Sequence, residues 1–384
     1  MDLMRMPGGH GQRLVALDAL RGFNMLWIIG ADRIADALKD LRFPGASLVS
    51  AQLNHASWNG FTSNDLIYPL FIFLVGVSLT FSLRRRMERG QSRPRLVGHI
   101  LWRTGLMYLI GMYLCNAGLD WQNWLHPEEL RWVGVLQRIA LCFGITALLM
   151  VFTRPWHQVA VAGALLIGYW ILMRFVPVPG VGAGVFAPGV NFANYLDGLY
   201  MPGRLYYDNW DPEGMLSTLP AVVNCLGGVF TGYWLQSADR PDLRFGKTVW
   251  NRKVVYLAAA GLCLAGFGLL WSLDFPLNKK IWTSSYVLLT IGLSALLMAF
   301  FYWLVDLRGH RKLVFPLVVV GLNSLFIYVA AAEIPFAAMA AWLMGPHFLA
   351  WLGPGQALSL ALATLLLEWL LLYGMFKFKV FIKL

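Results

Sequence analysis

Charged residues are scarce in this chain of 384 residues. Asp, Glu, Lys and Arg together make up 13% of it, while 58% of its residues are hydrophobic. A soluble globular domain has about 25% charged residues, and one aqueous core cannot hide this much apolar surface. The composition therefore excludes an ordinary soluble protein, and the repeated apolar runs of about 20 residues indicate a polytopic membrane protein.

Cysteine and the usual nucleotide and metal motifs are also missing or sparse. The four cysteines are scattered, mostly inside apolar runs, which is typical of packing residues rather than of disulfides. The chain has no phosphate-binding loop, no dinucleotide glycine fingerprint, no Gly-x-Ser-x-Gly elbow and no metal-ligand spacing, so we predict no metal site. Asp18 and Arg21 interrupt the first apolar run, which disfavours a cleaved signal peptide.

The long apolar runs predict an all-α polytopic membrane helix bundle that forms a single domain over residues 1–384. They are too long for barrel strands, and helices satisfy their own backbone groups inside lipid. We expect about ten transmembrane helices, at 14–38, 64–83, 96–116, 131–152, 156–175, 215–236, 253–273, 282–305, 313–332 and 355–376. Residues 333–353 are apolar but broken by Pro335 and Pro346, so we interpret them as a re-entrant or interfacial segment, with an eleventh span as the alternative.

The distribution of Lys and Arg predicts the orientation of the bundle. Basic residues concentrate in the loops around 84–95, 240–253 and 308–312 and in the tail after 376, which are placed in the cytoplasm by the positive-inside rule. Both termini, including the short polar segment 1–13, are then cytoplasmic, and an eleventh span would move the basic tail outside. The net charge of +11 indicates contact with membrane lipid, not with nucleic acid. The long 176–214 loop lies on the outer side.

A polar stretch, residues 54–65, lies at the outer end of the second predicted span and is the main candidate for a catalytic site. His55 stands there near Trp58, and imidazole can act as a general base or a nucleophile near neutral pH. An interfacial histidine that binds a loop carbonyl is the alternative. Asp65 follows Thr62 at capping-box spacing, so this carboxylate can cap the helix, orient His55 or do both. Asp32, near the outer end of the first span, can approach His55.

Other polar residues near or within the spans form two further candidate groups. Within the spans, buried cations and amides that need partners are candidate ligands of an anionic donor, with structural ion pairs such as Asp18–Arg21 near the inner end of the first span as the alternative: Arg21, Arg103, Gln137 and Arg138. On the outer side, candidate substrate-binding residues are Asn54, Trp58, Asn59, Asp211, Glu213, Lys279 and Asn323. Helix initiation also explains Asp211 and Glu213, and an interhelical hydrogen bond also explains Asn323. Acidic groups outside and arginines inside suit an amine acceptor and a phosphate-bearing donor.

An ordered set of motifs resembles one known family, the heparan-α-glucosaminide N-acetyltransferases and their bacterial relatives. The match extends from about residue 13 to about residue 330, through Leu17-Asp-Ala-Leu-Arg-Gly22, His55-Ala-Ser-Trp-Asn-Gly-Phe-Thr62, Asp65-Leu-Ile-Tyr-Pro69, Gly134-Val-Leu-Gln-Arg-Ile139, Asp211-Pro-Glu-Gly214, Asn278-Lys-Lys-Ile-Trp282 and Gly321-Leu-Asn-Ser-Leu-Phe-Ile-Tyr328. The resemblance implies that the family's active histidine falls on His55, its neighbouring carboxylate on Asp65, and an active-site asparagine position on Asp32.

These observations predict an acetyl-CoA-dependent amino-sugar N-acetyltransferase. As the resemblance implies, acetyl would pass from cytoplasmic acetyl-CoA to the amine of a glucosamine-type sugar on the outer side of a bacterial inner membrane, and the protein would be a homodimer. His55 acts either as the general base or as an acetyl carrier, Asp65 orients it, and Asp32 assists or binds the amine. The alternative is an amino-sugar transporter without acyl transfer, although the chain shows no inverted repeat.

Overall fold

The computed structural model describes residues 14–39, 41, 45–120, 122–238, 243–245 and 248–382. The predicted cytoplasmic segment 1–13 lies outside the described residues. The longer helices are α1 (Val15–Lys39), α3 (Ile67–Glu88), α4 (Arg93–Asn116), α5 (Val135–Phe152), α6 (Pro155–Phe175), α8 (Met215–Gln236), α9 (Arg252–Trp271), α10 (Ser284–Phe301) and α15 (Gln356–Lys377). The shorter ones are α2 (Ala46–Leu53), α7 (Phe192–Tyr200), α11 (Phe315–Leu322), α12 (Ser324–Glu333), α13 (Phe336–Met344) and α14 (Pro346–Trp351).

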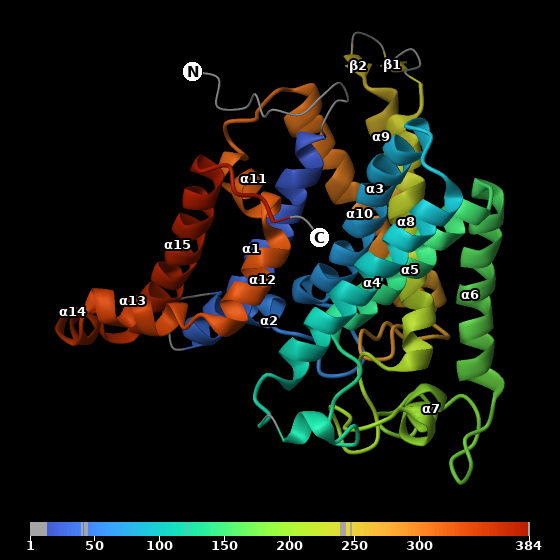
Figure 1. The fold of residues 1–384 in the computed structure, drawn as a ribbon, viewed down its shortest axis with the longest axis horizontal. Coiled ribbons are helices and arrows are strands. Elements are labelled where there is room, and N and C mark those ends of the chain that lie inside the picture. Colours follow the sequence, from blue (N-terminus) through green and yellow to red (C-terminus); the bar gives the residue numbers. More distant parts are fainter. Residues whose placement is uncertain are drawn as a thin grey trace.

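Shorter turns and one hairpin complete the described elements. A π-helical turn, Tyr302–Leu307, extends α10, and 3₁₀ turns occupy Ser63–Leu66, Asn123–Leu125 and Gly353–Gly355. Strands β1 (Leu243–Phe245) and β2 (Thr248–Trp250) pair antiparallel. The hairpin and α7 lie at opposite ends of the bundle, and α1 runs between the group of α11, α12 and α15 and the other long helices (Figure 1).

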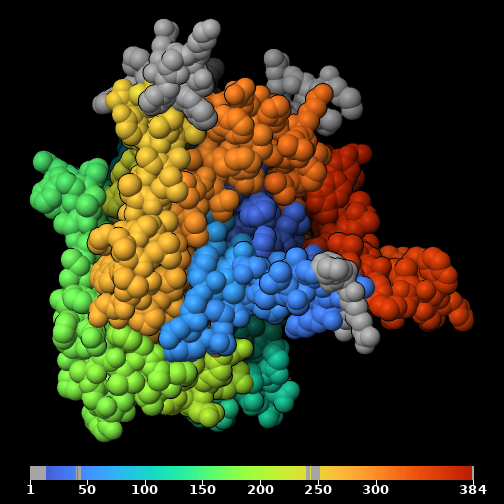
Figure 2. Space-filling view, turned by 180° about the vertical axis from the view of Figure 1, so that it is seen from behind, coloured from blue at the N-terminus to red at the C-terminus, as the bar shows by residue number. Residues whose placement is uncertain are grey.

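The predicted helix bundle is confirmed, but the count of about ten spans is not. Within the described residues, seven helices are long and apolar enough to cross a membrane, or eight if the pair α11–α12, bent by 75°, is one span. Each of the ten predicted runs coincides with a helix or a helix pair, yet α1 and α4, which carry Arg21, Asp32 and Arg103, are not among the seven. Helices α13 and α14 project sideways from the bundle (Figures 1 and 2). Their re-entrant role stays a prediction.

Helices α3 and α8 touch through their backbones. A Cβ atom added at Gly228 would lie 1.9 Å from the carbonyl oxygen of Phe73, and one added at Gly76 would lie 1.9 Å from that of Cys225. Only glycine permits this approach, which is a common way for membrane helices to pack. The contact fixes α3 in the core, and with it the polar stretch that leads into α3.

The bend between α11 and α12 falls at Asn323. Its side-chain Nδ2 donates to the carbonyl oxygen of Val380 at 3.0 Å, and its Oδ1 accepts from the backbone N–H of Ile382 at 2.9 Å. The segment after α15 therefore satisfies the amide at a break in a span, where unpaired polar groups are costly. Asn323, predicted to bind substrate, is thus a partner of the chain's own backbone.

Candidate active site

The stretch between α2 and α3 folds around the carboxylate of Asp65. Its Oδ2 accepts from the backbone N–H of Ala56 at 3.2 Å and of Thr62 at 3.0 Å, and from the Thr62 hydroxyl at 3.0 Å. Its Oδ1 lies 2.9 Å from Nδ1 of His55. Asp65 is only 1% exposed, so these partners replace water. The carboxylate completes a capping box and also contacts the imidazole, as the capping-box spacing allowed.

This contact determines which nitrogen of His55 carries the proton. A carboxylate can only accept, so Nδ1 carries the proton and donates it, which leaves the lone pair on Nε2. The Tyr286 hydroxyl donates to the backbone carbonyl of Asp65 at 2.6 Å and holds the carboxylate from behind. The His55 side chain is 47% exposed. The arrangement is that of an imidazole oriented by a carboxylate, as in a base or nucleophile.

Lys279 lies directly against this pair. Its Nζ is 2.9 Å from Nε2 of His55, 3.1 Å from Nδ1, and 3.9 Å from Oδ1 of Asp65. Burial lowers the pKa of Lys279 to about 8, and the nearby Asp65 carboxylate opposes that decrease. The turn that carries Lys279 is tied to the His55 stretch, because Asn278 Nδ2 donates to Oδ1 of Asn59 at 3.1 Å.

A cavity of about 390 Å³ opens in front of His55. Asp32, Glu213 and Lys279 line it together with His55. Asp32 accepts from Nδ2 of Asn64 at 3.4 Å, so α1 contributes a carboxylate to the same space. The structure thus brings together five of the predicted site residues. His55 and Asp65 come from the polar stretch, Asp32 comes from α1, and Glu213 and Lys279 come from later segments.

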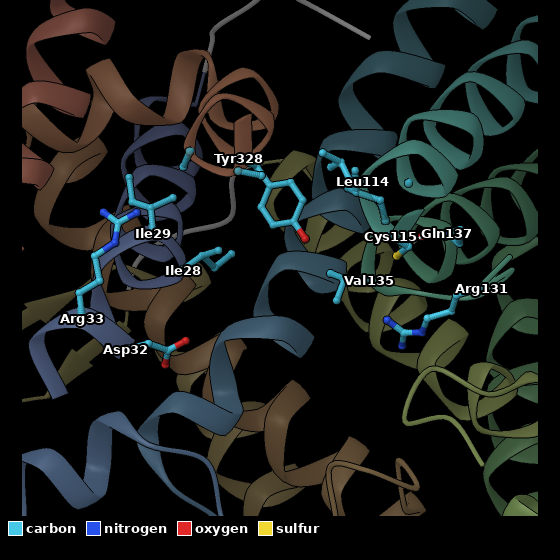
Figure 3. A pocket seen from close by; sticks show the side chains of 14 residues that line it. Ile28, Ile29, Asp32, Arg33, Leu114, Cys115, Arg131, Val135, Gln137 and Tyr328 are labelled. Carbon is cyan, nitrogen blue, oxygen red and sulfur yellow. Dashed lines mark hydrogen bonds between the residues drawn. The ribbon is translucent and has the colours of Figure 1, made fainter. Parts of the chain in front are cut away.

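A second cavity of about 580 Å³ adjoins the first and shares Asp32, Arg131 and Tyr328 with it. The Tyr328 ring points into the space between α1, which carries Asp32, and the segment of Leu114 (Figure 3). Gln137, predicted to bind the donor, lines this cavity, and its Nε2 is buried with no hydrogen-bond partner among the described residues. An unsatisfied buried amide of this kind is able to bind a ligand's carbonyl group.

Arg131 and two carboxylates form a closed cluster on the far wall of the first cavity. Its Nε and Nη2 each donate to Asp211 at 2.8 Å, and Nη2 also lies 2.8 Å from Glu213. Arg138 is 1% exposed, donates to the carbonyl oxygen of Pro212 at 2.9 Å, and lies 4.9 Å from the ring centroid of Trp282. Burial raises the pKa of Glu213, and the arginines oppose this. Asp211 and Arg138 therefore hold the turn before α8.

The remaining predicted residues lie outside the two cavities. Arg21 pairs with Asp18 at 3.4 Å and donates to the Ser78 hydroxyl at 2.6 Å. The guanidinium of Arg103 lies 4.8 Å from the ring centroid of Phe143. Asn54 Nδ2 donates to the carbonyl oxygen of Ser50 at 2.8 Å, and Trp58 Nε1 donates to that of Phe186 at 2.8 Å. These contacts hold the helices and the loop around the site.

Several cavity residues were not among the predicted ones. They are Trp27, Asn64, Tyr206, Tyr207, Lys280, Trp282 and Tyr328. Tyr206 and Tyr207 precede the Asp211-Pro-Glu-Gly214 motif, and Lys280 follows Lys279, so their position beside predicted residues was the available signal. Nothing in their spacing shows that they face the same cavity.

The fold and the site define a membrane protein in which a buried carboxylate orients an imidazole toward a cavity. The family model described as "Heparan-alpha-glucosaminide N-acetyltransferase, catalytic" matches residues 13–263, and the chain belongs to this family. It is 28% identical over 328 residues to the heparan-alpha-glucosaminide N-acetyltransferase of Homo sapiens, and 27% identical over 324 residues to that of Mus musculus. These alignments cover 72% of this chain and 48% of each relative, so the chain spans about half the length of these relatives. The family predicted from the motifs is confirmed.

Proposed function

We propose that the chain is a transmembrane N-acetyltransferase that moves acetyl from acetyl-CoA to the amine of a glucosamine-type sugar. The observation that carries the proposal is the His55–Asp65 pair facing a cavity, at 2.9 Å, in a chain of this family. Asp32 and Glu213 line the same cavity and suit a cationic amine by charge. The family name supplies the acetyl transfer and the sugar class, and the chain's own residues supply the base.

In the direct route, the sugar amine reacts in its neutral form, and His55 Nε2 takes a proton from its nitrogen as that nitrogen bonds to the acetyl carbon. The carbon–sulfur bond then breaks, and His55 passes the proton to the departing sulfur. Asp65 holds Nδ1 throughout and stabilises the imidazolium. Lys279 must first move off Nε2. Its ammonium then lies where it can stabilise the negative charge that develops on the acetyl oxygen.

In the second route, His55 Nε2 bonds to the acetyl carbon as the carbon–sulfur bond breaks and the thiolate leaves. The amine then attacks the acetyl-imidazole, which frees His55, and the amine proton goes to the thiolate. Both routes need the same tautomer of His55 and the same displacement of Lys279. They differ in whether acetyl is retained on the protein when the sugar is withheld. Mass spectrometry of His55-containing peptides after exposure to acetyl-CoA alone distinguishes them.

The donor supplies the acetyl group as a thioester, and of the four residues predicted to hold it, Gln137 fits best. Its unpaired Nε2 lines the cavity beside the one that contains His55, and a donor with amide groups in its arm suits such a partner. Arg138 donates to protein groups through Nη2 alone, and its Nε and Nη1 are buried without a hydrogen-bond partner among the described residues, but it lines neither cavity. Arg21 and Arg103 lie on α1 and α4, away from both cavities, and we propose that they attract donor phosphates.

The sidedness of the reaction follows from the loop charges. We propose that the end of the bundle with the basic loops and both termini faces the cytoplasm of a bacterial inner membrane. The His55 site, near the end that carries α7, then faces outward. A homodimer is also part of the proposal.

The decisive test uses purified protein with acetyl-CoA and D-glucosamine. We expect the wild type to form N-acetylglucosamine and His55→Ala to lose about 10²–10⁴-fold in rate, the usual contribution of an acid–base group. His126→Ala is the matched control, because the His126 side chain is 61% exposed and pairs with Glu128 on a loop. An unchanged unfolding temperature excludes a folding defect. Full transfer by His55→Ala would contradict the assignment.

A further inference from the structure

We propose that Tyr206 and Tyr207 form an aromatic corner that binds the ring of the acceptor sugar. Both residues precede α8 and line the cavity that contains His55. The two ring centroids are 4.9 Å apart and the ring planes meet at 77°, so the rings form an open corner. This inference rests on the proposed function and names the part of the site that recognises the acceptor.

The two rings are unusually accessible for aromatic side chains on a cavity wall. Tyr206 is 60% exposed and Tyr207 is 38% exposed. Large aromatic rings bury much apolar area and contribute strongly to binding when a ligand covers them. Neither ring is needed to fill the core, so covering them with a ligand gains apolar burial without disturbing the fold.

Each ring is supported by a neighbour. The guanidinium of Arg131 lies 4.9 Å from the ring centroid of Tyr206, and Asp211, which binds Arg131, also accepts from the backbone N–H of Tyr206 at 3.0 Å. The Tyr207 ring stacks on Trp210 at 4.3 Å with an angle of 18° between the planes. Rings held in this way need little ordering when a ligand arrives, which favours affinity.

The backbone that carries the corner is also fixed. Arg131 and Gly203 form an isolated antiparallel bridge, and the N–H of Arg204 donates to the carbonyl oxygen of Leu130 at 3.0 Å. Gly203 has a φ of 72°, and a Cβ atom there would lie 2.1 Å from that same carbonyl oxygen. Glycine is therefore required at the start of the segment, and the corner keeps its place against the loop before α5.

The surroundings favour a sugar over other ligands with a flat or apolar face. A pyranose has an apolar C–H face, which can stack on an aromatic ring, and a polar edge of hydroxyl groups. Lys280 Nζ lies 3.5 Å from the Tyr207 hydroxyl, and the carboxylates of Asp32 and Glu213 line the same cavity, so polar partners surround the rings. Arg131, Lys279 and Lys280 line the cavity as well, so both charge signs are available to the hydroxyl groups and the amine of an amino sugar.

The test compares Tyr206→Leu, which removes the ring, with Tyr206→Phe, which keeps it. Tyr200→Leu is the matched control, because Tyr200 is 68% exposed on α7 and is not among the residues lining the cavity. Saturation-transfer NMR with D-glucosamine measures contact and affinity directly, and steady-state rates give KM for each substrate. We expect Tyr206→Leu to weaken glucosamine binding about tenfold, from the size of an aromatic contact. We also expect KM for acetyl-CoA to stay within about twofold, Tyr206→Phe to keep most of the glucosamine affinity, and Tyr200→Leu to match the wild type.

Two results would overturn the proposal that Tyr206 and Tyr207 bind the sugar ring. One is wild-type affinity for D-glucosamine in both Tyr206→Leu and Tyr207→Leu. The other is a loss of acetyl-CoA affinity in these variants while glucosamine binding is unchanged, which would assign the rings to the donor. A protein that binds glucosamine through Tyr206 but transfers no acetyl to it would instead keep the corner and refute the proposed acetyltransferase function.

Discussion

Two charged clusters line the same cavity, one around Arg131 and one around His55, and they differ in how their members are paired. Arg131 binds Asp211 through two nitrogens and also binds Glu213, and its side chain is 13% exposed. His55, by contrast, is 47% exposed, and Lys279 lies within 3.1 Å of both ring nitrogens although only one of them can accept. In the first cluster both carboxylates are paired with Arg131, while in the second the imidazole is partly exposed, and under the proposed function its contact with Lys279 is exchanged for a substrate.

We infer from this difference that the Arg131 cluster stabilises the fold and that the His55 cluster takes part in the reaction. A saturated, buried ion pair holds its shape because removing either partner leaves an uncompensated charge. A partly exposed imidazole beside a movable ammonium can change partners at low cost. We therefore expect substitutions in the Arg131 cluster to change stability first, and substitutions in the His55 cluster to change rate first.

The largest effect on stability is expected for Arg131→Met. The change strands the carboxylates of Asp211 and Glu213, so we expect a loss of about 3–5 kcal/mol in the free energy of unfolding. Arg174→Met is the matched control, because Arg174 and its partner Asp274 are 42% and 43% exposed, and such a pair contributes about 0–1 kcal/mol. Unfolding in detergent measures both. A stable Arg131→Met protein that has lost acetyl transfer would move Arg131 into the chemistry and erase the contrast.

Asp65→Asn tests the His55 cluster. Asp65 is the N3 residue of the capping box, and the side-chain oxygen of asparagine can still accept from the Thr62 backbone N–H, so stability should fall by less than about 1 kcal/mol. The amide cannot stabilise the imidazolium, so the rate of acetyl transfer should fall about 10²–10³-fold. Asp36→Asn, at a position whose side chain is 69% exposed, is the control. A clear loss of stability with an unchanged rate would leave Asp65 as a helix cap alone.

The sequence was sufficient for the parts of this contrast that depend on local spacing. The apolar runs predicted the helices. His55 and Asp65 are only ten residues apart in one polar stretch, so their contact could be predicted from the sequence. Lys279 is 224 residues from His55, so only the packing of α10 against the core places them together. Sequence reasoning likewise could not show that Pro212 and Trp282 contact the guanidinium of Arg138, whose role as a donor ligand stays a prediction.

The same limit explains two features of the fold. The ninth predicted span is continuous in composition, yet it bends by 75° where Asn323 takes backbone partners from the segment after α15. Those partners are 57 and 59 residues away, and no local pattern reveals them. The aromatic corner depends on support by Arg131, which comes from the loop before α5, and so it also arises only in three dimensions.

The smallest predicted effect concerns the pH dependence of kcat, which depends on Lys279 in the His55 cluster. The pKa of Lys279 is lowered by burial to about 8, so Lys279 is charged below that pH and loses its charge as the pH rises through it. If this charge stabilises the developing oxyanion, kcat should fall about tenfold per pH unit above 8. Arginine stays charged there, so Lys279→Arg should lose this limb of the profile, whatever its absolute rate.

Lys280→Arg is the matched control for that profile, since Lys280 contacts Tyr207 rather than His55. The sugar amine titrates equally in all three proteins, so a difference between profiles reports the lysine alone. Identical alkaline limbs in the wild type and in Lys279→Arg would remove Lys279 from the transition state and leave it as a resting partner of His55.

The central claim is that this cavity transfers acetyl and does not transport sugar. The most direct measurement uses proteoliposomes with radiolabelled acetyl-CoA on one side of the membrane and D-glucosamine on the other. The account predicts labelled N-acetylglucosamine on the sugar side, no entry of intact glucosamine, and no product with His55→Ala. Saturable movement of glucosamine across the membrane without acetylation would contradict it.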